Sequence, residues 1–276
     1  MKKKSGKIIW IVVLIISILI FLLCAGYLVK YFVFDPSQNL TRPTQTQTAS
    51  QEATKDEATA APTQEPTSRF KETTAKLEET ETVDFYELMQ INPDIYAWIY
   101  IPNTNVDYPV AQSAKGISDS FYLDHNVYKN YQFSGTIYSE KQNAKDFSDP
   151  CTVLYGHNML NGSMFASLHN FNNKEFFDNN NTMFVFTEDK LYTYLIYSAY
   201  QYDDRHLLNS FNMNDDSSFR EYLDSTLLQR PYYCNVREDI KLSTDDRILT
   251  LSTCMNGGGN VRYLVQGVLV DVQDTE

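Results

Sequence analysis

The stretch ILTLSTC at residues 248–254 is a strand-like run that ends abruptly in a cysteine. The glycine-rich segment MNGGGN follows at 255–260, and Arg262 then opens a second strand-like run. Consecutive glycines let the backbone reverse tightly, so the two runs are predicted to pair antiparallel as a hairpin. Such a hairpin brings Arg262 near Cys254, at a strand end where a thiol can point out of the sheet into a groove.

A guanidinium beside a thiol suggests nucleophilic catalysis. The positive charge favours the thiolate, and the planar fork can donate two hydrogen bonds to a developing oxyanion. Each residue also has a structural interpretation, since an isolated cysteine is often a small core residue. Arg262 would then be a surface arginine on a strand.

A cysteine nucleophile also needs a general acid and base, which is normally histidine. Of the four histidines, His157 in VLYGHNM is the best placed, because it follows a strand and Gly156 frees the backbone before it. His125 in YLDHN is a weaker rival. His169 lies in a predicted short helix and His206 in an insertion, so both are expected to be surface residues.

From about residue 83 the chain has a globular pattern dominated by short, alternating, β-branched and aromatic runs. Eight such strands at this spacing predict an antiparallel barrel or sandwich. Helices are expected in DFYELMQINPD before the first strand, at 162–171, and at 216–230 in a long insertion before the cysteine strand. The expected strands are 97–101, 106–110, 135–138, 151–155, 183–187, 191–201, 248–253 and 262–271.

The N-terminus carries an uncharged run of 22 residues, Ile8–Val29, preceded by four lysines. This length spans a bilayer core of about 30 Å, and the lysines favour a cytoplasmic N-terminus. A cleaved signal peptide is the alternative, but its apolar core is usually shorter. Residues 1–7 are therefore predicted to be cytoplasmic and 8–29 to be a transmembrane signal-anchor.

Residues 30–82 are predicted to be a disordered extracellular stalk, followed by a catalytic domain at 83–276. The stretch 36–82 is rich in Thr, Gln, Glu, Ala and Pro and has almost no large apolar side chains. A flexible tether of these 47 residues would reach roughly 40 Å. A helix near residues 69–82, at the end of this stretch, is kept as an alternative to disorder.

The charge and the cysteines exclude some classes of protein. A net charge of −12 argues against a nucleic-acid partner. The four cysteines show no CxxC spacing, so no zinc site is predicted, and they are too few for a disulfide scaffold. Their spacing neither predicts nor excludes a disulfide between Cys151 and Cys234.

The motifs around these residues resemble those of a known family. TLSTC followed by an arginine on the next strand is similar to the signature of sortases, the cysteine transpeptidases of Gram-positive surfaces. LYGHNM followed by GSMFASL resembles the sortase histidine motif, and NPDIYAWIYIPNTNVDYPV at 92–110 resembles the opening of class B sortase domains. The helix-bearing insertion also fits class B. The resemblance covers about residues 83–272, with the motifs in the expected order.

The resemblance implies an eight-stranded antiparallel β-barrel with an N-terminal helix and a helix in the insertion. It implies Cys254 as nucleophile, His157 as general acid and base, and Arg262 as the stabiliser of the oxyanion or substrate. The short loop between Cys254 and Arg262 departs from the family pattern, so the resemblance does not indicate how the leaving group or amine is held there.

A weaker implication concerns four groove residues. The positions that match the lining of the sorting-signal groove in similar enzymes are Tyr155, Ser252, Thr253 and Leu123. For Leu123, simple core packing is an equal alternative.

No cofactor or metal is predicted. Some sortases use calcium through acidic side chains near the insertion. The acidic pairs Asp203–Asp204 and Asp215–Asp216 are expected to form a solvated face instead.

The implied reaction cleaves a C-terminal sorting motif of secreted proteins through a thioacyl-enzyme. The new carboxyl end is then joined to an amine of a peptidoglycan precursor or a pilin, outside the cell membrane. The sequence leaves open the sorting motif, the acceptor amine, and a housekeeping or pilus-building role.

Two alternatives remain. One is a secreted cysteine peptidase, although papain-like enzymes place the cysteine before the histidine and here His157 comes first by 97 residues. The other is a non-enzymatic, membrane-tethered binding module with a structural cysteine. A thiol-reactive probe would distinguish them, because a buried core cysteine stays inert.

Overall fold

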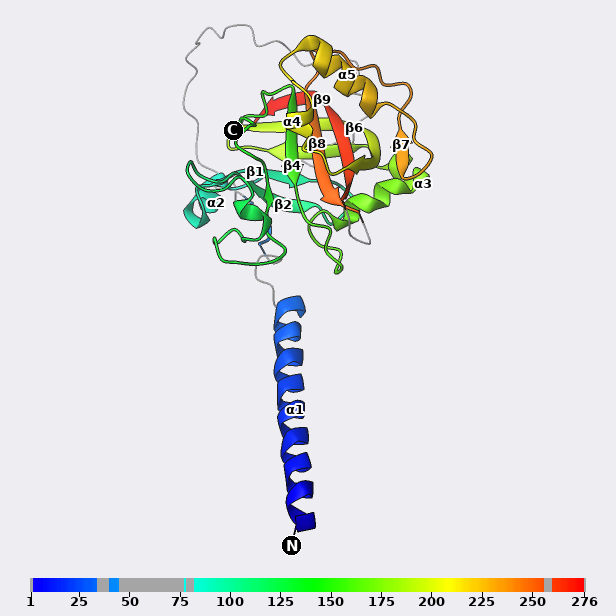
Figure 1. Cartoon of the computed structure of the whole chain (residues 1–276). Helices are drawn as coiled ribbons and strands as arrows, with labels where there is room; N and C mark the ends of the chain where they lie inside the picture. Colours follow the sequence, from blue (N-terminus) through cyan, green and yellow to red (C-terminus); the bar gives the residue numbers. More distant parts are fainter. Residues whose placement is uncertain (1, 34–39, 45–76, 78–81, 256–259, 276) are drawn as a thin grey trace. The chain divides into compact units, whose positions relative to one another are not determined.

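The computed structural model describes residues 2–33, 40–44, 77, 82–255 and 260–275, and the chain divides into two units, Met1–Leu40 and Thr41–Glu276. The first unit contains helix α1, Lys2–Val33 (Figure 1). Its stretch Trp10–Leu28 is long and apolar enough to cross a membrane, and none of it is buried. The possible helix near 69–82 falls almost wholly outside the described residues.

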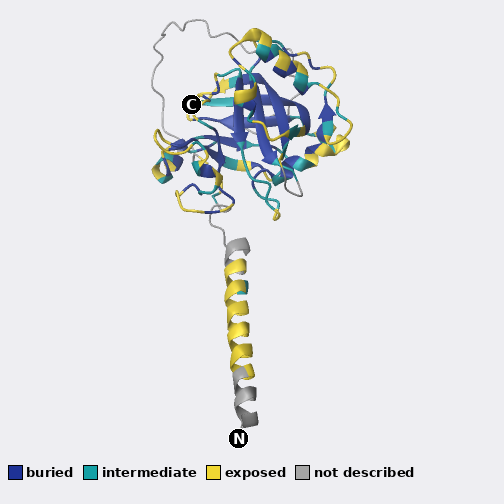
Figure 2. Ribbon diagram, in the orientation of Figure 1, coloured by how far each residue is buried: buried dark blue, intermediate teal, exposed yellow. Residues whose placement is uncertain are grey.

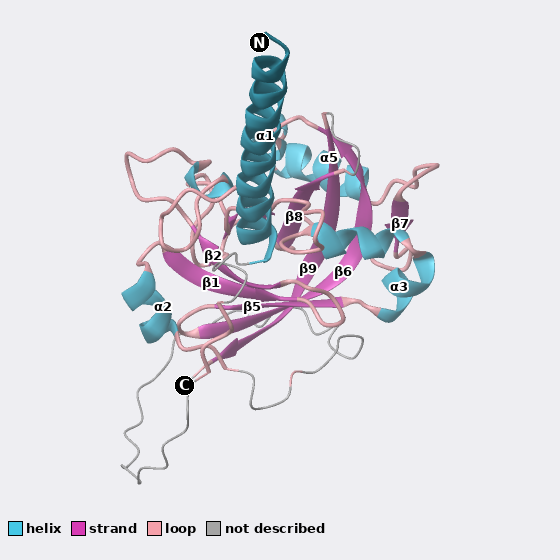
Figure 3. Ribbon diagram, turned by 90° about the horizontal axis from the view of Figure 1, so that it is seen from below, coloured by secondary structure: helices cyan, strands magenta, loops and turns pink. Residues whose placement is uncertain are grey.

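The second unit is a closed β-barrel (Figures 1 and 3). Strand β5 pairs with both β1 and β6, which closes the sheet in the order β5-β1-β2-β3-β4-β8-β9-β6. A short extra strand, β7 (Cys234–Val236), pairs only with β6. The eight barrel strands are β1 Ile95–Tyr100, β2 Asp107–Ala111, β3 Ile137–Tyr138, β4 Cys151–Tyr155, β5 Thr182–Phe186, β6 Lys190–Asp203, β8 Ile248–Cys254 and β9 Val261–Asp274.

The mainly β prediction and its eight strands are confirmed, but the antiparallel prediction is wrong for two pairings. Strand β2 runs parallel to β3, and β4 runs parallel to β8. Parallel neighbours need a long crossover connection, and residues 112–136 and 156–247 provide these two crossovers. Residue alternation identifies a strand but not its neighbour, so the sequence did not reveal the mixed sheet.

The helices of the second unit lie outside the barrel (Figure 1). Helix α2, Phe85–Ile91, is capped by the Asp84 carboxylate, which accepts from the Glu87 N–H at 3.0 Å, and it ends before Pro93 as predicted. Helix α5, Asp216–Thr226, confirms the predicted helix of the insertion. The helix expected at 162–171 is a 3₁₀ helix, η4, Ala166–Asn172. The remaining short elements are η3 Phe121–Leu123, α3 Lys174–Asn179 and α4 Leu207–Ser210.

Most residues of the barrel strands are buried (Figure 2), and their side chains belong to two apolar clusters. On β8, Leu249 and Leu251 belong to one apolar cluster, whereas Ile248 belongs to a second cluster with Phe219 and Leu223 of α5. Side chains alternate along a strand. The even-numbered residues of β8 therefore face the helical insertion, and this alternation puts Cys254 on the same side as α5.

A buried polar network ties α5 to this wall. The Gln266 side chain on β9 donates from Nε2 to the Tyr222 hydroxyl at 2.6 Å and to Thr250 Oγ1 at 3.2 Å. Its Oε1 accepts from the Tyr197 hydroxyl at 3.0 Å. Buried polar groups need such partners, because an unsatisfied one keeps its full desolvation cost.

We expect Gln266→Leu to lower the free energy of unfolding by about 1–3 kcal/mol, because the hydroxyls of Tyr222 and Tyr197 each lose a partner. Urea denaturation followed by circular dichroism measures this change. The matched control is Gln201→Leu at an exposed position of β6, which should shift stability by less than about 0.5 kcal/mol. Equal stability of the two variants would contradict a stabilising network.

Candidate active site

The predicted hairpin around the cysteine is confirmed. Strands β8 and β9 pair antiparallel, and Cys254 lies directly opposite Arg262 in the register. The Met255 N–H donates to the Val261 carbonyl at 3.1 Å, so pairing continues one step beyond the strand end. The glycines at 257–259 lie outside the described residues.

Strand β4 brings His157 to the same end of the sheet. It runs parallel to β8 with Tyr155 opposite Ser252, and the Gly156 N–H donates to the Ser252 carbonyl at 3.1 Å. Position 156 requires glycine because there is no room for a side chain, and not because its backbone conformation is unusual. A Cβ there would lie 2.5 Å from the Ile137 side chain and 2.7 Å from the Phe165 ring.

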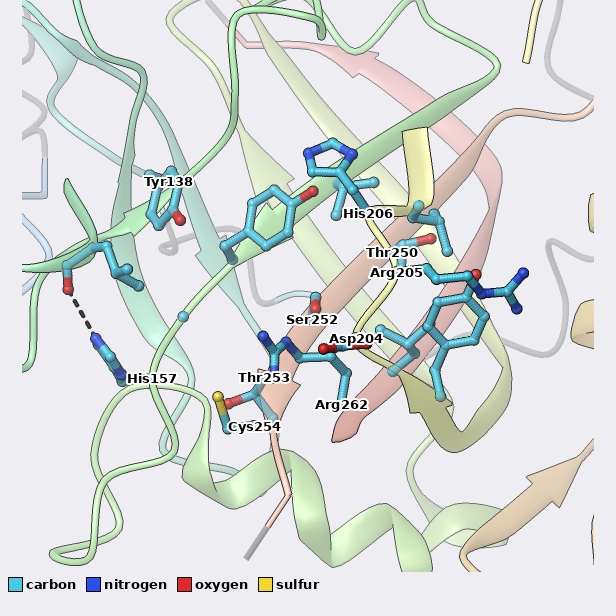
Figure 4. Close-up of a pocket in the computed structure, with 17 residues that line it drawn as sticks. Tyr138, His157, Asp204, Arg205, His206, Thr250, Ser252, Thr253, Cys254 and Arg262 are labelled. Carbon is cyan, nitrogen blue, oxygen red and sulfur yellow. Dashed lines mark hydrogen bonds between the residues drawn. The ribbon is translucent and has the colours of Figure 1, made fainter. Parts of the chain in front are cut away.

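A surface groove opens where these strands end (Figure 4). Strands β4, β8 and β9 form one side, and residues 202–207 at the end of β6 and the start of α4 form the other. All seven predicted catalytic and substrate-binding residues line it. The residues that line the groove are Leu123, Tyr138, Val153, Tyr155, Gly156, His157, Tyr202, Asp204, Arg205, His206, Leu207, Thr250, Ser252, Thr253, Cys254, Arg262 and Leu264.

The His157 imidazole is turned toward the Leu123 carbonyl, 2.9 Å from its Nε2 (Figure 4). A carbonyl oxygen only accepts hydrogen bonds, so Nε2 carries the proton and Nδ1 is the basic nitrogen of the neutral ring. The Phe133 ring stacks on the imidazole with centroids 5.1 Å apart. Burial lowers the pKa of His157, an effect opposed by the Leu123 bond and by the nearby Asp124 charge.

Cys254 is held through its main chain. Its carbonyl accepts from Asn158 Nδ2 at 3.0 Å and lies 3.0 Å from His169 Nε2. Within residues 82–255 and 260–275, the Cys254 thiol makes no hydrogen bond, and no carboxylate pairs with Arg262. The guanidinium of Arg262 donates from Nη1 to the Val261 carbonyl at 3.4 Å, so it is held beside Cys254 without an acidic partner in this part of the chain.

The other cysteines do not occupy comparable positions. Cys151 is fully buried between Tyr222 and Thr250, and burial raises the pKa of its thiol to about 11. Cys234 is half-buried on β7, with its sulfur 3.6 Å from the Leu228 carbonyl. All four cysteines are free, so the Cys151–Cys234 disulfide is not formed.

Comparisons with known proteins agree with this geometry. The family model described as the sortase domain matches residues 99–270. Sortase B of Listeria monocytogenes is 32% identical over 186 residues, which cover 67% of this chain and 73% of that protein. This chain belongs to the sortase family.

The solved structures indicate the class. Sortase B of Clostridium perfringens superposes with a TM-score of 0.61 at 35% identity, covering 68% of this chain and 100% of that chain. A Staphylococcus aureus sortase B–substrate complex has a TM-score of 0.59 at 25% identity, covering 68% and 84%. The protein is a class B sortase, a cysteine transpeptidase, as its motifs predicted.

Two histidines of this sortase were misjudged from the sequence. His169 is half-buried, stacks on Tyr263 with centroids 4.9 Å apart, and contacts the Cys254 carbonyl. His206 lines the groove, and its Nε2 lies 2.6 Å from Glu140 Oε2. Both are partly exposed, but tertiary packing that no local pattern encodes brings His206 to the groove and His169 to the Cys254 carbonyl, so neither is simply a surface residue. His125, by contrast, stacks on Phe121 and does not line the groove.

The groove of this sortase offers unpaired polar groups. The Tyr155 hydroxyl and Thr253 Oγ1 are buried and have no hydrogen-bond partner among the described residues. Leu123 is 40% exposed, which excludes the core-packing alternative for this residue. The groove therefore has an exposed apolar side chain at Leu123 and two buried hydroxyls without partners among the described residues.

Metal ligation finds no support in the described part of the chain, where no group of three or more His, Cys, Asp or Glu side chains could hold an ion. Asp203 pairs with Arg205 at 2.8 Å, and the Asp215 carboxylate caps α5 by accepting from the Ser218 N–H. These two acidic residues already have structural roles.

Removing the Phe133 ring that stacks on His157 provides a direct test of the electrostatics of this histidine. We expect Phe133→Ala to raise the pKa of His157 toward the ordinary value near 6.5, because water regains access to the imidazolium. An NMR titration of the His157 ring proton measures both variants. The pKa of His157 is lower in the folded state than its unfolded value near 6.5. The stabilising contribution of the neutral ring is therefore fully present above pH 6.5, and the free energy of unfolding decreases as the pH falls below that value.

The matched control for that titration is Tyr131→Ala. Tyr131 is 71% exposed in the same loop and contacts His125 rather than His157. Its removal should leave the His157 titration unchanged. A similar shift in both variants would show that the loop as a whole, rather than the stacked ring, sets the pKa.

Proposed function

We propose that this sortase uses Cys254 as nucleophile, Arg262 as oxyanion stabiliser and His157 as general acid and base on a C-terminal sorting motif. The supporting observation is the pairing of Cys254 with Arg262 at the ends of β8 and β9. His157 lines the same groove from the end of β4. The other three cysteines lie outside this groove.

The first step forms a thioacyl-enzyme. The Cys254 thiolate attacks a backbone carbonyl of the sorting motif, and the guanidinium of Arg262 donates hydrogen bonds to the resulting oxyanion. The His157 imidazolium protonates the departing amine as the C–N bond breaks. Nδ1 is the atom that would carry this proton, since Nε2 faces the Leu123 carbonyl.

The second step resolves the thioacyl-enzyme with an amine. His157, now neutral, accepts a proton from the incoming nitrogen as it attacks the thioester carbonyl. Collapse of the tetrahedral intermediate releases Cys254 and forms a new amide. The proposed acceptors are an amine of a peptidoglycan precursor or a pilin lysine.

The substrate-binding roles extend the proposal along the groove. Tyr155 and Thr253 line the groove, and their buried hydroxyls lack partners among the described residues, so a bound peptide that reaches them would supply the missing hydrogen bonds. Ser252 shares the Cys254 face of β8. The exposed Leu123 side chain provides an apolar contact beside His157.

The proposed location is the outer face of the cell membrane. Helix α1 would act as an uncleaved anchor with residues 1–7 in the cytoplasm, and the barrel would lie outside. The apolar stretch Trp10–Leu28 and the lysines before it support this orientation. The secreted substrates and the lipid-linked acceptors are accessible on that side.

The proposal is tested by incubating the full chain in detergent micelles with a sorting-motif peptide library and several amines. Mass spectrometry should detect one cleaved motif and an amide joined to the preferred amine. Hydrolysis products alone, in the presence of every amine offered, would overturn the proposed transfer. Products that form equally well with inactive, alkylated enzyme would overturn the role of the thiol.

A further inference from the structure

The structure describes residues 40–44 of the predicted stalk, and two of them, Arg42 and Pro43, contact residues of the catalytic domain. The Arg42 side chain is only 11% exposed. Its Nη2 and Nε donate to Asp107 Oδ1 at 2.8 and 3.2 Å. An arginine buried to this extent on a partner carboxylate is unusual in a segment whose composition predicts no ordered contacts.

Aromatic rings complete the Arg42 site. The guanidinium carbon lies 4.5 Å from the centroid of the Tyr100 ring and 5.2 Å from that of Phe186. Asp107 is itself positioned, because it also accepts from the indole N–H of the buried Trp98 at 2.5 Å. A planar guanidinium can stack on rings and bond a carboxylate at once, which the ammonium of a lysine cannot do.

The backbone provides a second, independent attachment. The Asp84 N–H donates to the Pro43 carbonyl at 2.6 Å. Asp84 is also the residue that caps helix α2. The segment therefore contacts the barrel wall through Arg42 and the start of the first domain helix through Pro43.

The attachment lies on the wall opposite the groove. Asp107, Tyr100 and Phe186 belong to the neighbouring strands β2, β1 and β5. In the closed order β5-β1-β2-β3-β4-β8-β9-β6, strand β1 is four steps from β8 in either direction. Contacts made there leave Cys254 and its groove uncovered.

We propose that Thr41–Thr44 is a strap, a segment of the chain that docks on the β5–β1–β2 wall and shortens the working tether. Only eight residue steps separate Val33, where α1 ends, from Thr41 (41 − 33 = 8). A chain of that length reaches at most about 28 Å when extended. Without the strap, 50 steps separate Val33 from Val83 (83 − 33 = 50), a contour of about 170 Å.

The strap has a functional consequence. A shorter tether confines the barrel to a thinner layer above the membrane and raises its effective concentration toward acceptors held there. It also fixes the point where the tether joins the barrel. Because that point lies opposite β8, tension on the tether acts first on the β5–β1–β2 wall rather than directly on β8.

The test uses the full chain reconstituted in vesicles of phosphatidylethanolamine and phosphatidylglycerol. A fluorescent protein fused after Glu276 and a dye-labelled lipid report the distance of the barrel from the membrane by energy transfer. Hydrogen–deuterium exchange reports the Asp84 amide. In Arg42→Ala, energy transfer should fall and Asp84 exchange should speed up by at least about tenfold.

The control is Lys174→Ala, which removes an exposed i,i+4 pair with Asp178 within α3 and no contact of residues 41–44. It should change neither signal. Unchanged energy transfer and unchanged Asp84 exchange in Arg42→Ala would overturn the strap. Turnover of a soluble peptide should stay at the wild-type level in Arg42→Ala, and its loss would also overturn the proposal, since the segment would then support the barrel itself.

Discussion

Replacing Cys254 with alanine is expected to abolish both peptide cleavage and thioacyl formation while the barrel stays folded. The side chain is half-buried at the strand end, and its thiol has no hydrogen bond within the described residues, so its removal leaves no polar group unsatisfied. Without the proposed nucleophile, the variant can still bind the peptide and stabilise an oxyanion, but it cannot form the thioacyl bond. The rate should fall by about 10⁴-fold or more. Mass spectrometry of enzyme mixed with a sorting peptide would show no covalent adduct.

The chain offers a matched control in Cys234→Ala. This variant also removes a free, half-buried thiol, but from β7, outside the groove. It should form the thioacyl adduct and turn over at nearly the wild-type rate. Turnover by pure Cys254→Ala enzyme would contradict the assignment of the nucleophile, and Cys151 could not explain it, because that thiol is fully buried with its pKa raised to about 11.

The sequence predicted the two strands and the hairpin that carry the candidate catalytic residues, because each has a clear local pattern next to a functional motif. The strands at 151–155 and 248–253 were located closely because each is an unbroken buried run that ends in a distinctive motif. The hairpin placed Arg262 opposite Cys254 because a short loop leaves few registers. These two features were sufficient to predict the centre of the candidate site.

The features that were missed depend on contacts between distant segments. The parallel pairing of β4 with β8 joins residues about 100 positions apart, and nothing in either run encodes its neighbour. The contact of His169 with the Cys254 carbonyl has the same origin. The contact of Arg42 with Asp107 joins a polar segment, poor in large apolar side chains, to a strand of the barrel. Composition alone therefore predicted that the segment around Arg42 makes no ordered contact. Residue patterns predict elements better than the partners of those elements.

The conservative substitution Arg262→Lys is expected to lower kcat by about 10²–10³-fold while KM changes little. Lysine keeps the positive charge that favours the thiolate, but its ammonium cannot present two parallel N–H donors to an oxyanion. The loss therefore belongs to the transition state rather than to substrate binding. Steady-state kinetics with the preferred sorting peptide and amine would separate the two parameters.

Arg205→Lys is the control for that substitution, since Arg205 lines the same groove but is 62% exposed and pairs with Asp203. Its kcat should stay within about threefold of the wild type, as expected for an exposed ion pair of small energetic value. A near-wild-type kcat for Arg262→Lys would mean that charge alone is sufficient. In that case Arg262 would act by stabilising the Cys254 thiolate, and the oxyanion would have to be bound by other donors at the ends of β4 and β8.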